Sequence, residues 1–254
     1  DNKPQALTPE IVAKAPPDGY TILVSPNAAW NTSLVRKVSY DPVKDLAPIT
    51  MAARYSSIVT VHPTLGINSV KDLLALAKAK PGTLNASTGS TGGAGHLALE
   101  LFKSMAGVNI TRVPYSSGSQ EIADLLGARV QMTIGPGPEM GPHIKSGKMK
   151  GLAVTTAQPS ALFPDLPTVA ASGVPGYVFE SSYNLFAPGG TPSAVINRLN
   201  QEVARALSKP NVRQLVADAG AEVVASTPEA MATVRESELA RLGKVLRDAG
   251  ITAQ

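Results

Sequence analysis

A Gly-, Ser- and Thr-rich segment lies directly before a helical pattern in the first half of the chain. Residues 85–96 read Asn-Ala-Ser-Thr-Gly-Ser-Thr-Gly-Gly-Ala-Gly-His, and an apolar-periodic run over residues 97–105 follows. Because the helix-stop pair Pro81-Gly82 precedes the segment, we predict a short strand, a tight turn and a helix start. The main-chain amides in the first turn of a helix lack partners, and the helix dipole is positive at that end. A Gly/Ser/Thr turn exposes such amides together with side-chain hydroxyls. The segment therefore predicts a site for a small anion.

Strands and helices alternate around this segment. We expect strands at residues 20–24, 57–61, 110–115, 130–134 and 149–155, and helices at residues 68–80, 97–105 and 119–126. This order predicts an α/β fold with a parallel sheet and helices on its faces. Such sheets bind ligands beyond the carboxyl ends of their strands, where the turns at Ser87, Tyr115 and Gly135 fall.

The last third of the chain has a different pattern. Residues 177–187 are predicted to be extended, and only helices are expected after them, at residues 193–207 and 212–219. The pair Thr227-Pro228 is a helix cap with a first-turn proline, and it opens a long amphipathic helix that ends near Asp248.

Composition excludes several classes of partner and chemistry. The net charge is +4, the basic residues are scattered and aromatic residues are 4% of the chain, so we expect no nucleic-acid partner. The chain has no cysteine, which excludes disulfides, thiolate metal sites and cysteine nucleophiles. No stretch approaches the ~18 apolar residues of a membrane span. The first residues lack the composition of a signal peptide, so an exported form is expected to have lost its leader.

No pattern points to a catalytic or metal centre. The three histidines, His62, His96 and His143, are dispersed, and His96 is expected to have a structural role at a helix start. No HExxH or G-x-S-x-G motif is present, and no lysine follows the glycines as it would in a Walker loop. We therefore expect no catalytic residue, no metal and no cofactor.

Several sequence blocks, taken in order, resemble a known family. They are residues 15–21 (Ala-Pro-Pro-Asp-Gly-Tyr-Thr), 40–48, 113–115, 142–148, 166–169 and 185–192. In this order they are similar to the substrate-binding receptors of tripartite tricarboxylate transporters, the Bug family. The resemblance implies a two-lobed, type II periplasmic-binding-protein-like α/β fold with parallel or mixed sheets and flanking helices. Residues 1–64 with 180–254 would form one lobe, and residues 65–179 the other.

The resemblance also implies a function. A member of this family is a periplasmic receptor that closes its lobes on a small carboxylate and delivers it to the membrane components of the transporter. The alternative from another class is an α/β enzyme that acts on a small anionic or phosphorylated substrate, with the Gly-rich turn holding a phosphate.

The resemblance assigns roles to particular residues, each with a structural alternative. Ser87, Gly89, Ser90 and Thr91 match a carboxylate-holding turn of the family, although serine and threonine also cap helices. Ser25, Asn27 and Ala28 would face the cleft or make an ordinary turn. Tyr115 would offer its hydroxyl to the ligand or stand at the rim.

Three further positions carry expectations about specificity and packing. Gly135 and Pro136 stand where many relatives carry a polar residue, often Asp, and this loss argues against an amino-acid ligand. Ser182, in the segment expected to cross between the lobes, would line the cleft or serve the hinge. Trp30, the only tryptophan, is expected to pack under its loop rather than wall the ligand.

The chain also departs from the family at its start. Members usually open with a strand–helix–strand unit before the position of Asp1. In the resemblance, that unit supplies one wall of the carboxylate site and a central strand of the first lobe. Its absence predicts weakened or altered binding and an exposed sheet edge that favours self-association. A third reading is a scaffold that has lost binding and persists as an oligomer.

Overall fold

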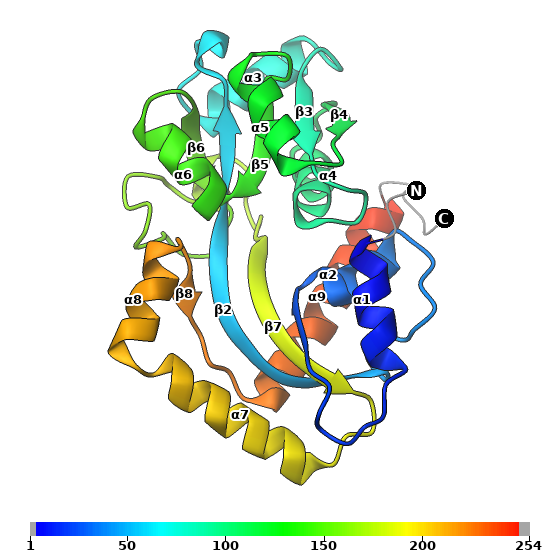
Figure 1. Cartoon of the computed structure of the whole chain (residues 1–254). Helices are drawn as coiled ribbons and strands as arrows, with labels where there is room; N and C mark the ends of the chain where they lie inside the picture. The colour runs from blue at the N-terminus through cyan, green and yellow to red at the C-terminus, as the bar shows by residue number, and fades with distance from the viewer. Residues whose placement is uncertain (1–3, 249–254) are drawn as a thin grey trace. The chain divides into compact units, whose positions relative to one another are not determined.

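The long strand β2, Leu46–Val61, runs through both structural units of the chain. The structure is a computed structural model that describes residues 4–248. Its chain divides after Arg54 and after Ser181: unit 1 comprises the segments before and after these two points, and unit 2 is residues 55–181. Figure 1 labels the helices and strands.

Unit 1 contains four strands and five α-helices in the part of the chain that the structure describes. Its elements are α1 (Pro4–Ala13), β1 (Leu23–Pro26), α2 (Ala28–Asn31), the first part of β2, most of β7 (Glu180–Pro188), α7 (Ser193–Leu207), α8 (Pro210–Asp218), β8 (Glu222–Val223) and α9 (Pro228–Asp248). The strand order is β1-β7-β2, and β8 pairs with β2. β1 is antiparallel to β7, and β8 is antiparallel to β2.

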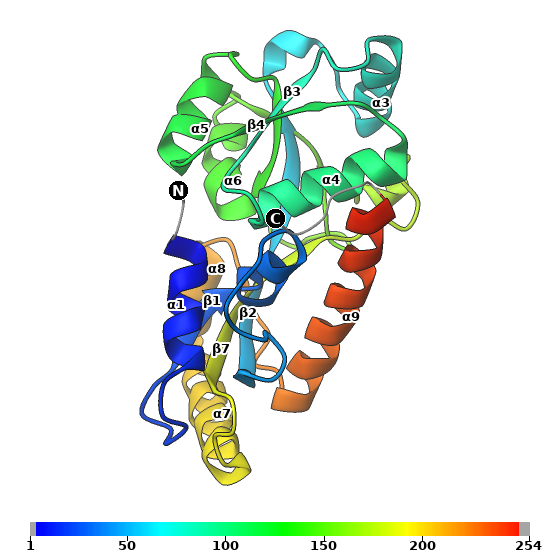
Figure 2. The same cartoon turned by 90° about the vertical axis from the view of Figure 1, so that its right-hand side faces the viewer.

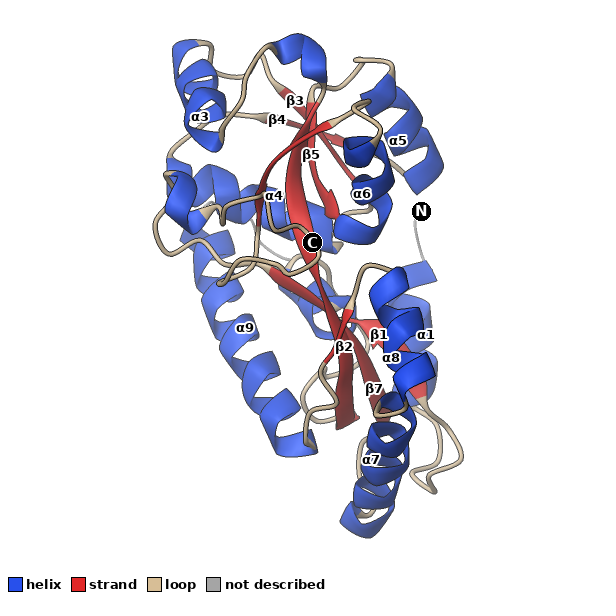
Figure 3. Ribbon diagram, turned by 90° about the vertical axis from the view of Figure 1, so that its left-hand side faces the viewer, coloured by secondary structure: helices blue, strands red, loops and turns tan. Residues whose placement is uncertain are grey.

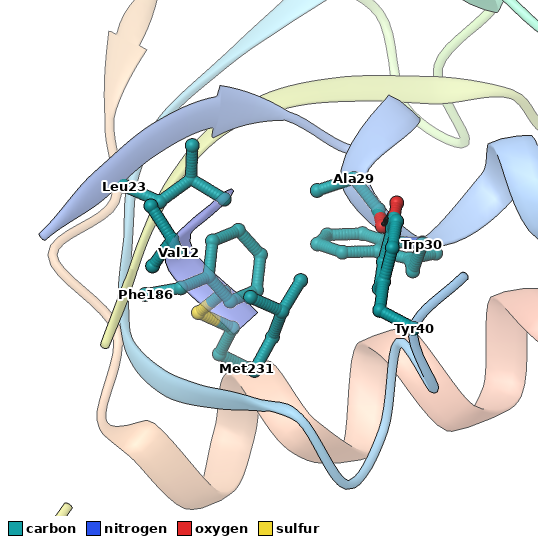
Figure 4. Packing of buried hydrophobic residues seen from close by; sticks show 8 residues of the cluster. Val12, Leu23, Ala29, Trp30, Tyr40, Phe186 and Met231 are labelled. Carbon is teal, nitrogen blue, oxygen red and sulfur yellow. Dashed lines mark hydrogen bonds between the residues drawn. The ribbon is translucent and has the colours of Figure 1, made fainter. Parts of the chain in front are cut away.

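Both faces of strand β7 are covered in unit 1. Phe186 packs on one face in a cluster with Trp30 of α2 and Met231 of α9, which Figure 4 shows. The neighbouring Ala187 points to the opposite face and packs with Ile196 of α7. Figures 2 and 3 show α9 and α7 on opposite sides of these strands. The alternation along β7 thus places α9 and the β1–α2 turn on one face.

Unit 2 is a sheet between two helix layers. Its elements are the end of β2, α3 (Val70–Ala79), β3 (Asn85–Thr88), α4 (Ala94–Ala106), β4 (Thr111–Pro114), α5 (Gly118–Leu126), β5 (Met132–Pro136), α6 (Gly137–Lys145) and β6 (Lys150–Val154). The strand order is β2-β5-β3-β4, with β6 on the other side of β2. Figures 2 and 3 show α3 and α4 on one face and α5 and α6 on the other.

Most predicted elements of unit 2 are confirmed within a few residues. Ser69 is the N-cap of α3, and its hydroxyl accepts a hydrogen bond from the Asp72 amide, as the capping pattern predicts. The strand, turn and helix around Gly89 are β3, a turn and α4. The sequence therefore encodes this half of the fold locally.

The strand predictions need three corrections. The first predicted strand is shifted: β1 begins at Leu23, and Tyr20 is 94% exposed in a bend. The expected strand at residues 57–61 is only the end of the much longer β2. The expectation of helices alone after residue 187 is wrong, because β8 pairs with β2. Two residues are too few to give a periodic signal.

The parallel-sheet prediction is correct for β3, β4 and β5 and wrong for β2. β3 is parallel to both β4 and β5, whereas β2 is antiparallel to β5 and β6. β2 enters from unit 1 and is not joined to its neighbours by a crossover helix. Its direction is therefore free of the constraint that βαβ units impose, and the fold is mixed α/β.

Candidate functional site

The parallel strands of unit 2 bring several predicted site residues to one sheet edge. Ser87 lies opposite Val113 of β4 and Thr133 of β5 in the register. The Tyr115 amide donates to the Thr88 carbonyl at 2.8 Å, which continues the pairing past the end of β4. Because parallel strands end on the same side, the segments that follow β3, β4 and β5, after Thr88, Pro114 and Pro136, share this edge.

The turn after β3 leaves main-chain donors unused. The amides of Gly89, Ser90 and Thr91 donate no hydrogen bond to the part of the chain that the structure describes. The Ser90 hydroxyl oxygen is buried and also has no partner there. Three successive free amides beside a free hydroxyl form an arrangement that suits an anion.

The next two amides of the turn are already bonded. Gly92 donates to His96 Nδ1 at 3.1 Å, and Gly93 donates to the Ser90 carbonyl at 3.0 Å. Burial, followed by the charges of Arg112 and Lys103, lowers the pKa of His96 to about 4. The imidazole is therefore neutral at ordinary pH, and its Nδ1 acts as an acceptor. His96 has the structural role expected of it, because it holds the turn to the first turn of α4.

Arg112 of β4 fixes the same turn from the neighbouring strand. Its Nε donates to Thr88 Oγ1 at 2.8 Å, and its Nη2 donates to Thr91 Oγ1 at 3.1 Å and to the Gly89 carbonyl at 3.4 Å. Burial lowers the pKa of Arg112, and the charge of Glu100 opposes that shift. A guanidinium keeps its proton even so, so the turn has a permanent positive charge beside it.

Ser87 and Tyr115 have partners within unit 2. Ser87 is fully buried, and its hydroxyl lies 3.4 Å from the Met132 carbonyl, which is a long hydrogen bond. The Tyr115 hydroxyl donates to Asp124 Oδ2 at 2.9 Å. Because a phenol has a single hydrogen, Tyr115 cannot donate to a ligand while it bonds Asp124.

Gly135 and Pro136 form the end of β5. A Cβ atom on Gly135 would lie 3.1 Å from the side chain of Met140, so a larger residue there would displace that side chain. Pro136 is the residue before α6 and lies opposite Ser57 of β2. Both residues therefore belong to the sheet edge, and neither offers a polar side chain.

A second group of predicted residues lies in unit 1. Ser25 of β1 lies opposite Asn184 of β7, so their side chains share one face of the pair. Asn184 Nδ2 donates to Ser182 Oγ at 2.9 Å, while the fully buried Asn184 Oδ1 has no partner among the described residues. Ser25 and Ser182 thus lie beside the buried Asn184 Oδ1, an acceptor that has no donor among the described residues.

The residues after β1 are hydrogen-bonded to Glu238 of helix α9. Asn27 Nδ2 donates to Glu238 Oε1 at 3.1 Å, and Trp30 Nε1 donates to Glu238 Oε2 at 2.7 Å. Trp30 is fully buried, with its ring edge-on to Phe186 at 5.8 Å between centroids. The predicted packing role of Trp30 is confirmed. Ala28, the last predicted residue of this group, begins α2.

Sequence reasoning did not select Arg112 or Glu238. Arg112 stands 24 positions from Thr88, and Glu238 stands 211 positions from Asn27. A basic residue in a strand and an acidic residue in an amphipathic helix are ordinary in sequence, so only the fold relates them to the turns. Asn184 belongs to the segment expected to cross between the lobes, and it lies two residues from Ser182 on the same strand face.

No helix of residues 4–248 has the length and hydropathy to cross a membrane. Over the same residues, His, Asp and Glu side chains form no group of three that could hold a metal ion.

The family model, the similar sequences and the similar solved structures all point to one family of proteins. The family model described as "Tripartite tricarboxylate transporter family receptor" matches residues 1–251. Protein BugT of Bordetella pertussis is 32% identical over 244 residues, which cover 95% of this chain and 75% of BugT. The solved structure "R. palustris Rpa4515 with adipate" is 36% identical with a TM-score of 0.88, over 98% of this chain and 84% of that one.

A second solved structure extends the comparison. MatC (Rpa3494) from Rhodopseudomonas palustris, with bound malate, is 25% identical with a TM-score of 0.84, over 95% of this chain and 84% of that one. The family match covers nearly the whole chain, and its members are substrate-binding receptors rather than enzymes. The chain therefore belongs to the tripartite tricarboxylate transporter receptor family, in its Bug-type branch.

Proposed function

We propose that this protein is a periplasmic receptor that captures a small carboxylate and delivers it to the membrane components of a tripartite transporter. The observation that carries the proposal is the turn after β3. Its free amides at Gly89, Ser90 and Thr91 and the buried Ser90 hydroxyl stand beside the guanidinium of Arg112. Hydrogen bonds from such donors to a carboxylate are charge-assisted and stronger than neutral ones.

The ligand class that we propose is a small dicarboxylate. Two similar solved proteins carry adipate and malate, and each of these acids has two carboxylates. The predicted residues of unit 1, Ser25, Asn27, Ala28 and Ser182, are proposed to hold the second polar end of the ligand. This part of the proposal includes the interlobe cleft and the lobe boundaries, residues 1–64 with 180–254 and residues 65–179, that the family resemblance implies.

A receptor and an enzyme differ in what becomes of the ligand. We would titrate adipate and malate into the purified protein by calorimetry and follow the acids by NMR for many hours. The expected result is saturable binding with a raised melting temperature, and recovery of the acid unchanged. Dimethyl adipate, which has the same chain without ionised ends, is the matched control and should not bind. Loss of the acid during incubation would contradict the proposal.

Localisation and transport need a test in cells. We would follow adipate uptake in a bacterium that makes the receptor behind an added export signal, together with the tripartite membrane components. The Ser90→Ala variant, which we expect to fold like the parent but to bind adipate more weakly, is measured in parallel. The receptor should appear in the periplasmic extract, and uptake should fall with the variant. Uptake that does not change when the receptor is removed would overturn the delivery step.

A further inference from the structure

A carboxylate is buried inside unit 1, where the proposed function assigns it no task. Glu238 of α9 is 9% exposed, and the buried face of this helix also carries Met231, Arg235 and Leu242. A buried carboxylate is costly unless hydrogen-bond donors surround it. The donors that bond Glu238 therefore indicate which part of the fold this side chain stabilises.

Three side-chain donors to Glu238 come from one short segment, residues 27–31. Trp30 Nε1 donates at 2.7 Å, Asn27 Nδ2 donates at 3.1 Å, and the side chain of Asn31 also bonds the carboxylate. This segment is the turn after β1 together with α2. The carboxylate thus grips the turn that carries the proposed ligand residues Asn27 and Ala28.

Asn27 bonds Glu238 and does not make the hydrogen bond that is usual at its position in the chain. It precedes α2 at the N-cap position, where an asparagine side chain normally accepts from an amide of the first turn. Here the side chain makes no cap bond, and its amide group is directed to Glu238 instead. The side-chain amide of Asn27 is therefore bonded to helix α9, while the cap bond to its own helix is not made.

We propose that Glu238 is a positioning residue, which holds the turn of residues 25–28 in its ligand-binding conformation through Asn27 and Trp30. The inference rests on the proposed function, because it assigns Glu238 to the same site. Glu238 itself touches no ligand in this scheme. It acts through the two donors, which define the position of the main chain after β1.

Both oxygen atoms of the Glu238 side chain accept hydrogen bonds from the turn. Burial raises the pKa of Glu238, while the bonds from Trp30, Asn31 and Asn27 and the positive charge of Arg241 lower it. A glutamine at this position would have only one acceptor atom, and its amide would face a donor. Glu238→Gln therefore changes the hydrogen bonding of the turn with almost no change in volume.

The single tryptophan makes the contact directly observable. The sequence contains one Trp, so the protein has one indole N–H signal in a ¹H–¹⁵N spectrum. That proton is the one donated to Glu238 Oε2. Its chemical shift reports the bond in the free protein, and a further change on addition of a ligand reports movement of the turn.

The test measures adipate and malate binding by calorimetry, together with the indole signal and the melting temperature, in the whole chain. For Glu238→Gln we expect a displaced indole signal and affinity about tenfold or more weaker, as for a site that loses its geometry. Trp30→Phe keeps the aromatic packing and removes one donor, and it should show a smaller loss of affinity. It also serves as the second variant should Glu238→Gln fail to fold.

The matched control is Arg235→Gln on the same buried helix face. Arg235 Nη1 donates to the carbonyls of Pro42 and Leu46, and not to the turn after β1. This variant should lower the melting temperature and leave affinity within about twofold of the original. If Glu238→Gln and Trp30→Phe bind both acids like the parent, Glu238 is only structural and the inference is overturned. If the parent binds neither acid while its indole signal shows the bond, the proposed function fails, and the inference fails with it.

Discussion

The guanidinium of Arg112 donates to Thr88 Oγ1 at 2.8 Å and so ties strand β4 to the end of strand β3. The same group reaches Thr91 Oγ1 at 3.1 Å across the turn. A planar guanidinium can make both bonds at once, whereas a lysine ammonium is a point charge on a flexible stem. The geometry of the turn that we propose to bind the carboxylate therefore depends on the planar shape of the guanidinium as well as on its charge.

We expect Arg112→Lys to weaken adipate binding about tenfold and to lower the free energy of unfolding by about 1–2 kcal/mol. Calorimetry and urea unfolding measure the two effects. Arg205→Lys is the control, because Arg205 is exposed and pairs with Glu202 on the surface of α7. It should change neither quantity. Equal affinity for the Arg112→Lys variant and the parent would show that charge alone suffices.

Ser90→Ala should separate binding from stability. The Ser90 hydroxyl oxygen is buried without a partner among the described residues, so its removal deletes an unsatisfied polar group. The free energy of unfolding without ligand should therefore stay within about 0.5 kcal/mol of the parent or rise. Affinity for adipate should fall about tenfold, because the ligand loses one hydrogen bond.

The opposite pattern is expected at a helix cap. Ser69→Ala removes the acceptor for the Asp72 amide at the start of α3. It should lower the free energy of unfolding by about 1 kcal/mol and leave binding unchanged. If Ser90→Ala behaves like Ser69→Ala, losing stability but not affinity, the Ser90 hydroxyl is not a ligand group.

Acid should destabilise the protein through His96. Its pKa is lowered from 6.5 to about 4 in the folded protein, so the unfolded chain binds a proton first as the pH falls. The stability from this group is complete above about pH 6.5 and is lost as the pH falls toward 4, a change of up to about 3 kcal/mol. Urea unfolding over this pH range measures it.

His96→Asn should remove this part of the pH dependence, because an asparagine can accept from Gly92 and does not titrate. His143→Asn is the control at another helical histidine, and it should keep the full slope. A His96→Asn protein with the same slope as the parent would assign the acid sensitivity to other groups.

The sequence alone predicts those parts of the fold that depend on neighbours in the chain. The Ser69 cap, the turn after β3 and helix α7 follow from spacing and turn chemistry. The first part of β2 does not, because Pro48 and the adjacent Ala52 and Ala53 lack strand propensity. Tertiary pairing with β8 supplies what the local sequence lacks.

The candidate site shows the same division. The donors of the turn after β3 could be predicted, since glycine, serine and threonine before a helix mark such a turn. The side chains that fix the position of each turn could not be predicted from the sequence. Arg112 acts across a strand pair, and Glu238 acts from the last helix of the described chain. Their roles depend on long-range packing, which a single sequence does not reveal.

Self-association through a sheet edge stays a prediction. β1 ends the strand order of the described chain, and Val24 on it is 65% exposed. A lysine in an edge strand opposes pairing with another chain. If the parent associates in native mass spectrometry at rising concentration, Val24→Lys should shift it toward monomer, and an unchanged distribution would assign the contact to another surface.

Tyr115→Phe decides between a ligand contact and a scaffold contact. The Tyr115 hydroxyl donates to Asp124 Oδ2 at 2.9 Å, and Arg129 Nη1 donates to the other oxygen of that carboxylate at 2.7 Å. Burial, together with the bond to Asp124, raises the pKa of Tyr115, so the phenol keeps its hydrogen and donates it to Asp124 Oδ2. We therefore expect adipate affinity to change less than about twofold in Tyr115→Phe, with a loss of about 1 kcal/mol in the free energy of unfolding. A loss of affinity of about tenfold would mean that the hydroxyl leaves Asp124 for the ligand. In that case Asp124→Asn, which weakens the competing acceptor, should bind adipate more tightly than the parent.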